Sequence, residues 1–122
     1  MTSGKQRLGD YLQHIVEAIE RVQRYTEDAD EVRFIGDEMM QDAVIRNLEV
    51  IGEASRNIER EHPGFAAARP ELPLSFAYEM RNVLSHGYFK VDLGIVWKTI
   101  ERELPVLLQQ VKVISKLLDA SA

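Results

Sequence analysis

Apolar residues recur along most of the chain at alternating steps of three and four, the spacing of one buried face of an α-helix. Three long stripes of this kind are present, and a shorter helix is expected from about Leu74 to Ser85. The long stripes are Leu8, Leu12, Ile15, Ile19 and Val22; Met40, Val44, Asn47, Ile51, Ala54 and Ile58; and Leu93, Trp97, Ile100, Leu104, Leu107, Val111, Ile114 and Leu118. The pattern predicts an all-α protein, a four-helix up-and-down bundle.

Residues that begin and end helices support this division. Asp37 and Asp92 can each cap a following helix by accepting hydrogen bonds from its free N–H groups. Pro63 is expected to end the second helix, because proline disfavours helical geometry in the residue before it. The segment from His62 to Pro73 holds three prolines and is expected to be the main loop, ahead of the third helix. Pro105 lies inside the last stripe and should kink that helix.

The size and composition are those of one globular domain, spanning residues 1–122, with 45% hydrophobic and 29% charged residues. Cysteine is absent, which excludes disulfides, thiolate nucleophiles and cysteine-built zinc sites. His14 and His62 share no metal-like spacing with His86, so neither a metal nor another cofactor is expected. No apolar run is long enough to cross a bilayer, and no signal region opens the chain. We therefore expect a cytoplasmic protein without a membrane partner.

The formal net charge of −5 restricts the ways in which the chain can bind nucleic acid. Proteins that hold long nucleic acids by releasing counterions are usually basic. If this protein contacts RNA, it must do so through a local basic pocket. The charge argues against a processive or high-affinity nucleic-acid binder.

The richest chemistry lies in the segment Arg81-Asn82-Val83-Leu84-Ser85-His86-Gly87-Tyr88. On an ideal helix Arg81 and His86 would point about 140° apart. Gly87 is expected to end the helix, so that His86 can turn back toward Arg81 and Tyr88 can lie beside both. Histidine exchanges protons near neutral pH, and arginine presents a planar, charged fork to phosphate oxygens. This combination is typical of phosphate chemistry without a metal.

The motif and its surroundings resemble the HepT-like branch of the HEPN superfamily. The likeness rests on the order arginine, four residues, histidine, one residue, tyrosine, and it extends over roughly residues 8–115. Residues 41–49 and 51–54 look like the second helix of that family. Residues 80–82, 86–92 and 95–97 look like its third and fourth helices. One departure is Leu74, where many members place tryptophan, which affects packing more than chemistry.

The resemblance implies an endoribonuclease toxin of a toxin–antitoxin module. In this family two chains build a composite site across a homodimer, which here would pair Arg81 and His86 with their copies around an RNA substrate. The usual partner is a minimal nucleotidyltransferase antitoxin that transfers AMP to the tyrosine of the motif, here Tyr88. A single chain supplies only one motif histidine, so acid and base roles in RNA cleavage also favour two copies.

Three further residues are weaker candidates. Asn82 and Ser85 could orient the site or satisfy local backbone groups. Asn47, the polar member of the second stripe, could reach the site or form a buried hydrogen bond that fixes helix register. Two other functions stay open: a non-catalytic, nucleotide-binding or interaction subunit that pairs with a nucleotidyltransferase, and a purely structural helical dimer. The acidic charge favours the subunit, and the intact set of Arg81, His86 and Tyr88 favours the enzyme.

Overall fold

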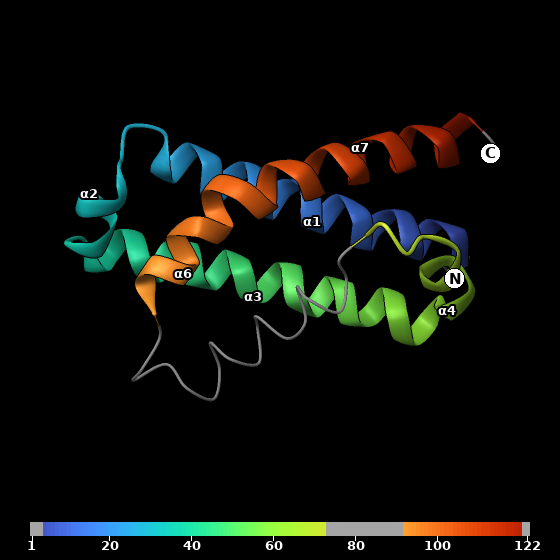
Figure 1. Ribbon diagram of the computed structural model, residues 1–122. Coiled ribbons are helices and arrows are strands. Elements are labelled where there is room, and N and C mark those ends of the chain that lie inside the picture. The colour runs from blue at the N-terminus through green and yellow to red at the C-terminus, as the bar shows by residue number, and fades with distance from the viewer. Residues whose placement is uncertain (1–3, 73–91, 121–122) are drawn as a thin grey trace.

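The computed structural model describes residues 4–72 and 92–120 (Figure 1). They form α1 (Gly4–Thr26), α2 (Glu31–Ile35), α3 (Glu38–Glu61), α4 (Pro63–Ala68), α6 (Leu93–Lys98), the π-helical turn η2 (Thr99–Glu103) and α7 (Leu104–Ala120). These two ranges contain no strand, which confirms the predicted all-α class. The expected third helix, at residues 74–85, lies outside the described residues, so the up-and-down order of four helices stays a prediction.

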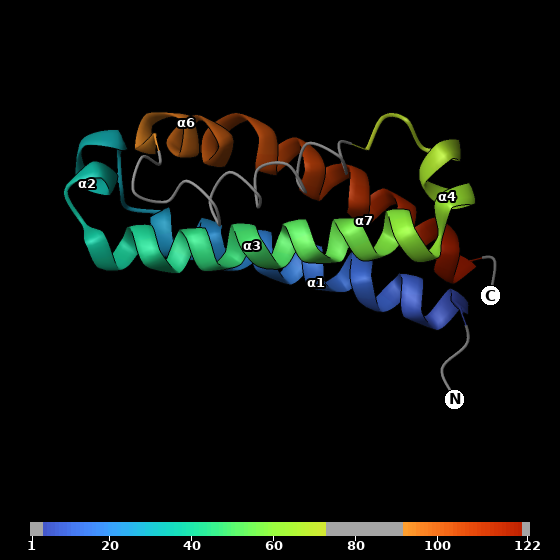
Figure 2. The ribbon, with the colours of Figure 1, turned by 90° about the horizontal axis from the view of Figure 1, so that it is seen from below.

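The two longest helices, α1 and α3, lie side by side and antiparallel (Figures 1 and 2). Their facing stripes are those predicted from the sequence, and Leu12, Ile15, Ile19, Val44 and Ile58 have no exposed surface. Full burial of a side chain of this size stabilises the fold by roughly 1.5–3 kcal/mol. The α1–α3 interface is therefore the main part of the core among the described helices.

The C-terminal helix covers the same core from a second side. Leu107, Val111 and Ile114 of α7 are buried, as the third stripe predicts, and α7 packs on α1. The kink expected at Pro105 takes the form of η2: the N–H of Leu104 donates to the carbonyl of Thr99, five residues back. This wider turn precedes the proline, which has no N–H and would crowd the preceding turn of a regular helix. Figure 1 shows α6 and α7 meeting at an angle there.

The helix caps follow the sequence. The carboxylate of Asp37 accepts from the N–H of Met40 at 3.0 Å, and that of Asp92 accepts from Gly94 and Ile95 at 2.9 and 3.2 Å. The helix α3 ends at Glu61, two residues before Pro63, as expected. Both predicted N-caps are confirmed.

The structure contains two short helices, α2 and α4, that the sequence did not predict. Residues 62–73 were expected to form a loop, but Pro63–Ala68 form α4. Proline at the first helical position and three successive alanines favour that turn. The helix α2 was also not foreseen; Asp30 begins it by accepting from the N–H of Arg33 at 2.8 Å. Helices of five or six residues are too short to show a periodic stripe.

Candidate functional site

Most of the site predicted from the sequence falls outside the described residues. Arg81, Asn82, Ser85, His86 and Tyr88 all belong to residues 73–91, and their proposed roles stay predictions. Asn47 is the remaining candidate, and its surroundings are described. The described part of the candidate site therefore lies on the helices α1 and α3.

Asn47 links the two long helices. Its side chain is buried, its Nδ2 donates to the carbonyl of Ala43 at 2.8 Å, and its Oδ1 accepts from Nε of Arg21 at 2.8 Å. The bond to Arg21 joins α3 to α1 across 26 residues of sequence. A buried amide must be hydrogen-bonded to avoid a desolvation cost of about 1–3 kcal/mol, so this pair specifies the register of α1 against α3. The structure thus shows the buried hydrogen bond that was one of the two roles predicted for Asn47.

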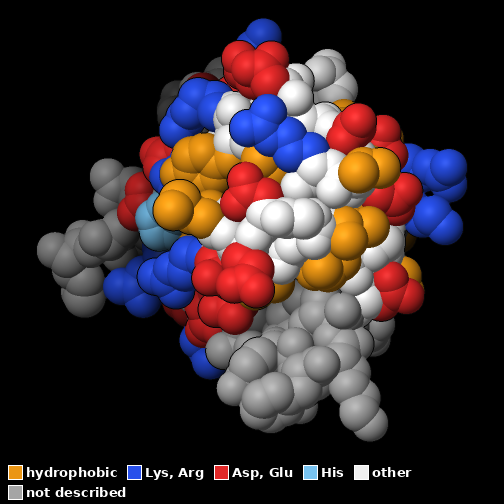
Figure 3. Space-filling view, turned by 90° about the vertical axis from the view of Figure 1, so that its left-hand side faces the viewer, with side chains coloured by type: hydrophobic (Ala, Val, Ile, Leu, Met, Phe, Trp, Pro, Cys, Tyr) orange, Lys and Arg blue, Asp and Glu red, His pale blue; other side chains and the backbone are white. Residues whose placement is uncertain are grey.

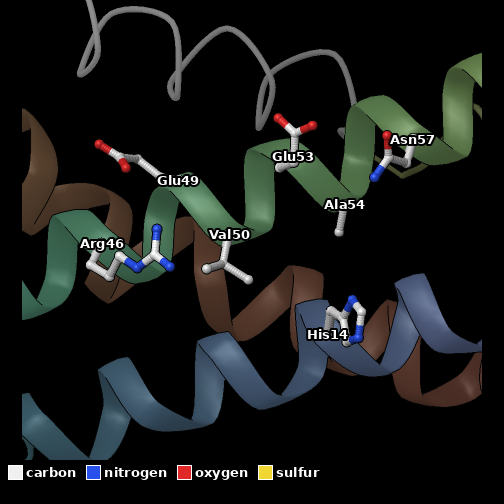
Figure 4. Close-up of a pocket in the computed structure, with 7 residues that line it drawn as sticks. All are labelled: His14, Arg46, Glu49, Val50, Glu53, Ala54 and Asn57. Carbon is white, nitrogen blue, oxygen red and sulfur yellow. The ribbon is translucent and has the colours of Figure 1, made fainter.

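A polar pocket of about 440 Å³ opens between α1 and α3, close to this link (Figure 4). One residue of α1 and six of α3 line it: His14, Arg46, Glu49, Val50, Glu53, Ala54 and Asn57. The α3 members lie on successive turns, at positions 46, 49 and 50, 53 and 54, and 57, so they line one side of the helix. Figure 4 shows Val50 and Ala54 on the side that faces α1 and His14, with Glu49 and Glu53 pointing away from α1. The size lies within the range of small-molecule sites.

The pocket offers mixed hydrogen-bonding groups. Arg46 supplies a permanent cation, and Glu49 and Glu53 supply carboxylate acceptors. Oδ1 of Asn57 accepts from the guanidinium of Arg60 at 2.8 Å, which fixes the amide so that its N–H groups can donate elsewhere. With two carboxylates and one arginine, this lining does not suit an isolated phosphate. It suits a neutral group that carries both donors and acceptors.

A cluster of charged and aromatic side chains closes the α1–α3 interface beyond this pocket. The hydroxyl of Tyr11 donates to Oε2 of Glu61 at 2.6 Å, and Arg7 lies 3.4 Å from the other carboxylate oxygen. The ring of Tyr11 also meets the rings of His14 and His62 edge-on, with centroids 6.5 and 6.4 Å apart. His62 is half-buried. The pocket residue His14 thus packs edge-on against Tyr11, whose hydroxyl is fixed by its hydrogen bond to Glu61.

A second pocket, of about 460 Å³, lies between α1 and α7. Its lining includes Gln13, Gln109, Lys112 and Lys116. Lys112 also pairs with Glu20 at 3.2 Å, and both side chains are well exposed. Exposed ion pairs contribute little, about 0–1 kcal/mol. Nothing else in its lining converges on a ligand, so the α1–α3 pocket is the stronger candidate.

Sequence reasoning missed most of the α1–α3 pocket. It gave no role to the lining residues Arg46, Glu49 and Asn57. The signal was present as polar residues at helical spacing beside the apolar stripe of α3. That spacing alone is also typical of a solvated helix face, and only the position of α1 distinguishes the two.

Two absences hold for residues 4–72 and 92–120. No three histidine, aspartate or glutamate side chains there are grouped so that they could hold a metal ion. No helix in the same ranges is long and apolar enough to cross a membrane.

The described helices define an all-α bundle with a polar pocket along its second long helix. The family model described as "Ribonuclease HepT-like" matches residues 15–114. The chain belongs to the HepT-like ribonuclease family. The match covers the six pocket residues of α3 and also the segment 81–88, and it begins one residue after His14.

Curated relatives agree with the family match. A probable ribonuclease HepT of Thermococcus cleftensis is 43% identical over 80% of this chain and 86% of its own length. A candidate RNase of Methanocaldococcus jannaschii is 36% identical over 85% of this chain and 93% of its own length. A second M. jannaschii protein, described as a gamma-glutamylcyclotransferase and candidate RNase, is 39% identical over 89% of this chain. The chain spans only 48% of that longer relative. No solved structure matches the chain significantly.

The bond between Tyr11 and Glu61 predicts a pH-dependent contribution to stability. The hydrogen bond from Tyr11 lowers the pKa of Glu61, and the same bond raises the pKa of Tyr11. A lowered carboxyl pKa stabilises the fold above the unfolded value of about 4.3, and this stabilisation is lost as the pH falls through the folded pKa. Tyr11→Phe should therefore lower the melting temperature at pH 7, and the difference from wild type should shrink below about pH 4.

The measurement is thermal unfolding followed by circular dichroism at pH 7 and at acidic pH. Tyr25→Phe is the matched control, because Tyr25 is an exposed tyrosine on the same helix and should show no pH-dependent difference. An equal loss for Tyr11→Phe at both pH values would contradict the role given to the Glu61 carboxylate.

Proposed function

We propose that the protein is a metal-independent endoribonuclease and the toxin of a toxin–antitoxin module. The observation that carries this proposal is the family match, which includes the motif with Arg81, His86 and Tyr88. The relatives described as RNases support the same activity. The toxin role, the antitoxin and the modification rest on the resemblance of the motif.

The proposed reaction is transfer within the RNA backbone. A general base takes the proton of a 2′-hydroxyl, and the 2′-oxygen attacks the adjacent phosphorus. The bond to the 5′-oxygen breaks, and a general acid protonates that leaving oxygen. The products are a 2′,3′-cyclic phosphate and a 5′-hydroxyl. His86 carries the proton transfers, and Arg81 stabilises the negative charge that builds on the phosphate oxygens.

The reaction needs a base and an acid, whereas each chain holds one motif histidine. We propose that two copies of the chain form a homodimer whose motifs face one another. The dimer then supplies two His86 side chains and two Arg81 side chains to one composite site. Asn82 and Ser85 complete the motif as supporting residues that orient the two catalytic groups.

The pocket between α1 and α3 is the proposed contact for a nucleobase of the substrate. A base carries ring and exocyclic N–H donors, which carboxylates such as Glu49 accept, and carbonyl oxygens, to which Asn57 can donate. Val50 and Ala54 provide an apolar wall for the flat face of the base. Recognition of one base in a local pocket is compatible with the net charge of −5.

The alternative is a non-catalytic subunit that pairs with a nucleotidyltransferase. The same pocket would then hold a nucleotide rather than a base of RNA. The acidic net charge is the observation that favours this function. RNA cleavage by the purified chain, and its loss in the variants below, distinguish the two.

His86→Ala should reduce the rate of RNA cleavage by about 100-fold or more, because general acid–base groups contribute factors of that size. The measurement is single-turnover cleavage of a labelled RNA in the presence of a metal chelator. His86→Ala and the control variant are each checked for a native circular dichroism spectrum. His62→Ala is the control, since His62 contacts Tyr11 and does not line the pocket. Cleavage by His86→Ala at the wild-type rate would refute the mechanism.

Arg46→Ala should weaken substrate binding more than it slows the chemical step. Loss of one hydrogen bond of about 0.5–1.5 kcal/mol raises KM by roughly 2–12-fold, while kcat changes less. Steady-state kinetics on a short RNA measure the two constants separately. Arg102→Ala, which removes an exposed arginine on η2, should leave both constants unchanged. Identical kinetics for Arg46→Ala and wild type would remove the pocket from the substrate site.

Tyr88→Phe should retain most of the cleavage activity and escape neutralisation. An AMP group on Tyr88 would place a bulky, negatively charged phosphate beside Arg81 and compete for its cation. The test is growth of cells that express the variant or the wild type together with a minimal nucleotidyltransferase. Intact-mass measurement of the purified wild-type protein should then show an added adenylate. An unmodified Tyr88 after co-expression would contradict this part of the proposal.

A further inference from the structure

Arg21 carries a positive charge into the interface between α1 and α3. The side chain is half-buried, and its Nε donates to Oδ1 of Asn47 at 2.8 Å. Within residues 4–72 and 92–120 its guanidinium pairs with no carboxylate. The carboxamide that holds it is neutral, so the guanidinium keeps its full charge. An arginine has five N–H donors, and the bond to Asn47 uses one of them.

Other arginines of the long helices are held differently. Arg7 and Arg60 both lie near the carboxylate of Glu61, at 3.4 and 3.8 Å, so the protein itself offsets part of their charge. Arg24 is exposed, and an exposed side chain of this length must lose its rotamer freedom when it binds a ligand. Arg21 combines an anchored side chain with a charge that no described carboxylate offsets.

The amide of Asn47 fixes the direction in which Arg21 is held. Asn47 is buried, and its Nδ2 donates to the carbonyl of Ala43 at 2.8 Å. Because that bond occupies the nitrogen, the oxygen of the same amide faces Arg21 and accepts from it. Turning the amide over would break both bonds. A cation that is ordered before binding loses less conformational entropy when its ligand arrives.

Arg21 lies at one end of the α1–α3 pocket. It follows the pocket residue His14 by seven positions, which is nearly two helical turns, so both residues share one face of α1 about 10 Å apart along the axis. Figure 4 shows Arg46 and Asn57 at opposite ends of the pocket, with His14 toward the Asn57 end. Arg21 contacts Asn47, the residue after Arg46. The anchored cation therefore lies at the Arg46 end.

This position suits a phosphate group of a nucleotide whose base occupies the pocket. One ribose ring joins a base to its phosphate, so the phosphate must lie just outside a pocket that holds the base. The middle of the pocket, with Glu49 and Glu53, would repel it. The end with Arg21 and Arg46 would attract it, and a guanidinium can give two parallel hydrogen bonds to phosphate oxygens.

The surface charge also favours one local contact over a broad one. Figure 3 looks onto the end of the molecule that carries α2 and shows Lys and Arg side chains interleaved with Asp, Glu and apolar side chains. The described part of this face therefore forms no continuous basic surface. With a net charge of −5, the chain needs individual cations placed where phosphates arrive.

We propose that Arg21 is a phosphate-binding residue, whose guanidinium holds the RNA phosphodiester next to the base in the α1–α3 pocket. The proposal rests on the RNA substrate proposed above and adds the contact for its backbone. Asn47 is then a positioning residue that acts through Arg21, besides fixing the register of the two helices.

The test is binding of a short fluorescent RNA to purified full-length protein, followed by anisotropy at several salt concentrations. The 2′-hydroxyls of this RNA are methylated, so that it cannot be cleaved. Arg21→Gln removes the charge and keeps an N–H donor for Asn47, so the fold should be kept. Arg24→Gln is the control, because it removes an exposed arginine about one turn further along the same helix.

Arg21→Gln should raise Kd by about tenfold or more, because a hydrogen bond to a charged group is lost. It should also reduce the slope of log Kd against log salt by about 0.7, the contribution of one phosphate contact in a single strand. Arg24→Gln should leave both quantities at the wild-type values. An unchanged slope in Arg21→Gln would overturn the proposal.

Two further variants separate phosphate binding from a purely structural role. Arg21→Lys keeps the charge without the planar fork, so it should keep the wild-type salt slope and bind RNA more weakly. Asn47→Asp keeps an acceptor for Nε of Arg21 and offsets its charge, so Kd should rise and the slope should fall although Arg21 is present. Thermal unfolding is measured for each variant. A role in helix register alone would change the melting temperature and leave the salt slope as in wild type.

Two ligand sources are distinguished by a second titration, with AMP in place of RNA. Wild type that binds AMP but not the RNA would assign the cation to a mononucleotide and overturn the proposal, as would wild type that binds neither. Cleavage is measured separately on unmodified RNA. Wild type that binds RNA through Arg21 and cleaves none would refute the proposed endoribonuclease and leave this contact standing.

Discussion

The antiparallel packing of α1 on α3 is the constraint on which the rest of the described structure depends. Residues without exposed surface on both helices drive it, among them Ile15, Ile19 and Val44. Apolar burial alone is non-directional, so it does not set the register of two helices. The bond from Arg21 to Asn47 and the bond from Tyr11 to Glu61 supply that direction at two levels of the interface. The pocket with His14 lies between these two levels.

The functional proposals follow from the negative net charge of the chain and from its single motif histidine. An acidic chain cannot hold RNA over its whole surface, so recognition must be local. The α1–α3 pocket is not the basic pocket that the sequence led us to expect; its mixed donors and acceptors are proposed for a base and not for phosphate. One motif histidine per chain cannot serve as base and acid at once. In the proposed homodimer, the second copy of the chain would supply the missing histidine.

The sequence predicted the long elements well because each buries a stripe of many turns. The helices α1, α3 and α7 and the caps at Asp37 and Asp92 are where periodicity and capping chemistry placed them. The helices α2 and α4 escaped because neither is long enough to show a period. The π-helical form of the kink before Pro105 depends on how the widened turn fits the core, which spacing does not reveal.

The site was predictable only in part. The motif residues Arg81 and His86 are conspicuous in the sequence because their chemistry is uncommon at that spacing, yet they lie outside the described residues. The lining of the α1–α3 pocket is the reverse case. Arg46, Glu49 and Asn57 resemble an ordinary solvated face until α1 is placed against them. A polar face becomes a pocket through tertiary packing, which a single helical period does not encode.

Subunit mixing tests the central claim most directly. Wild-type protein and inactive His86→Ala protein are mixed in varying ratio at constant total concentration, allowed to exchange subunits, and assayed for RNA cleavage. A site that needs His86 from both copies predicts that activity falls with the square of the wild-type fraction. Activity that falls in simple proportion to that fraction would show that each chain works alone, and would contradict a composite site.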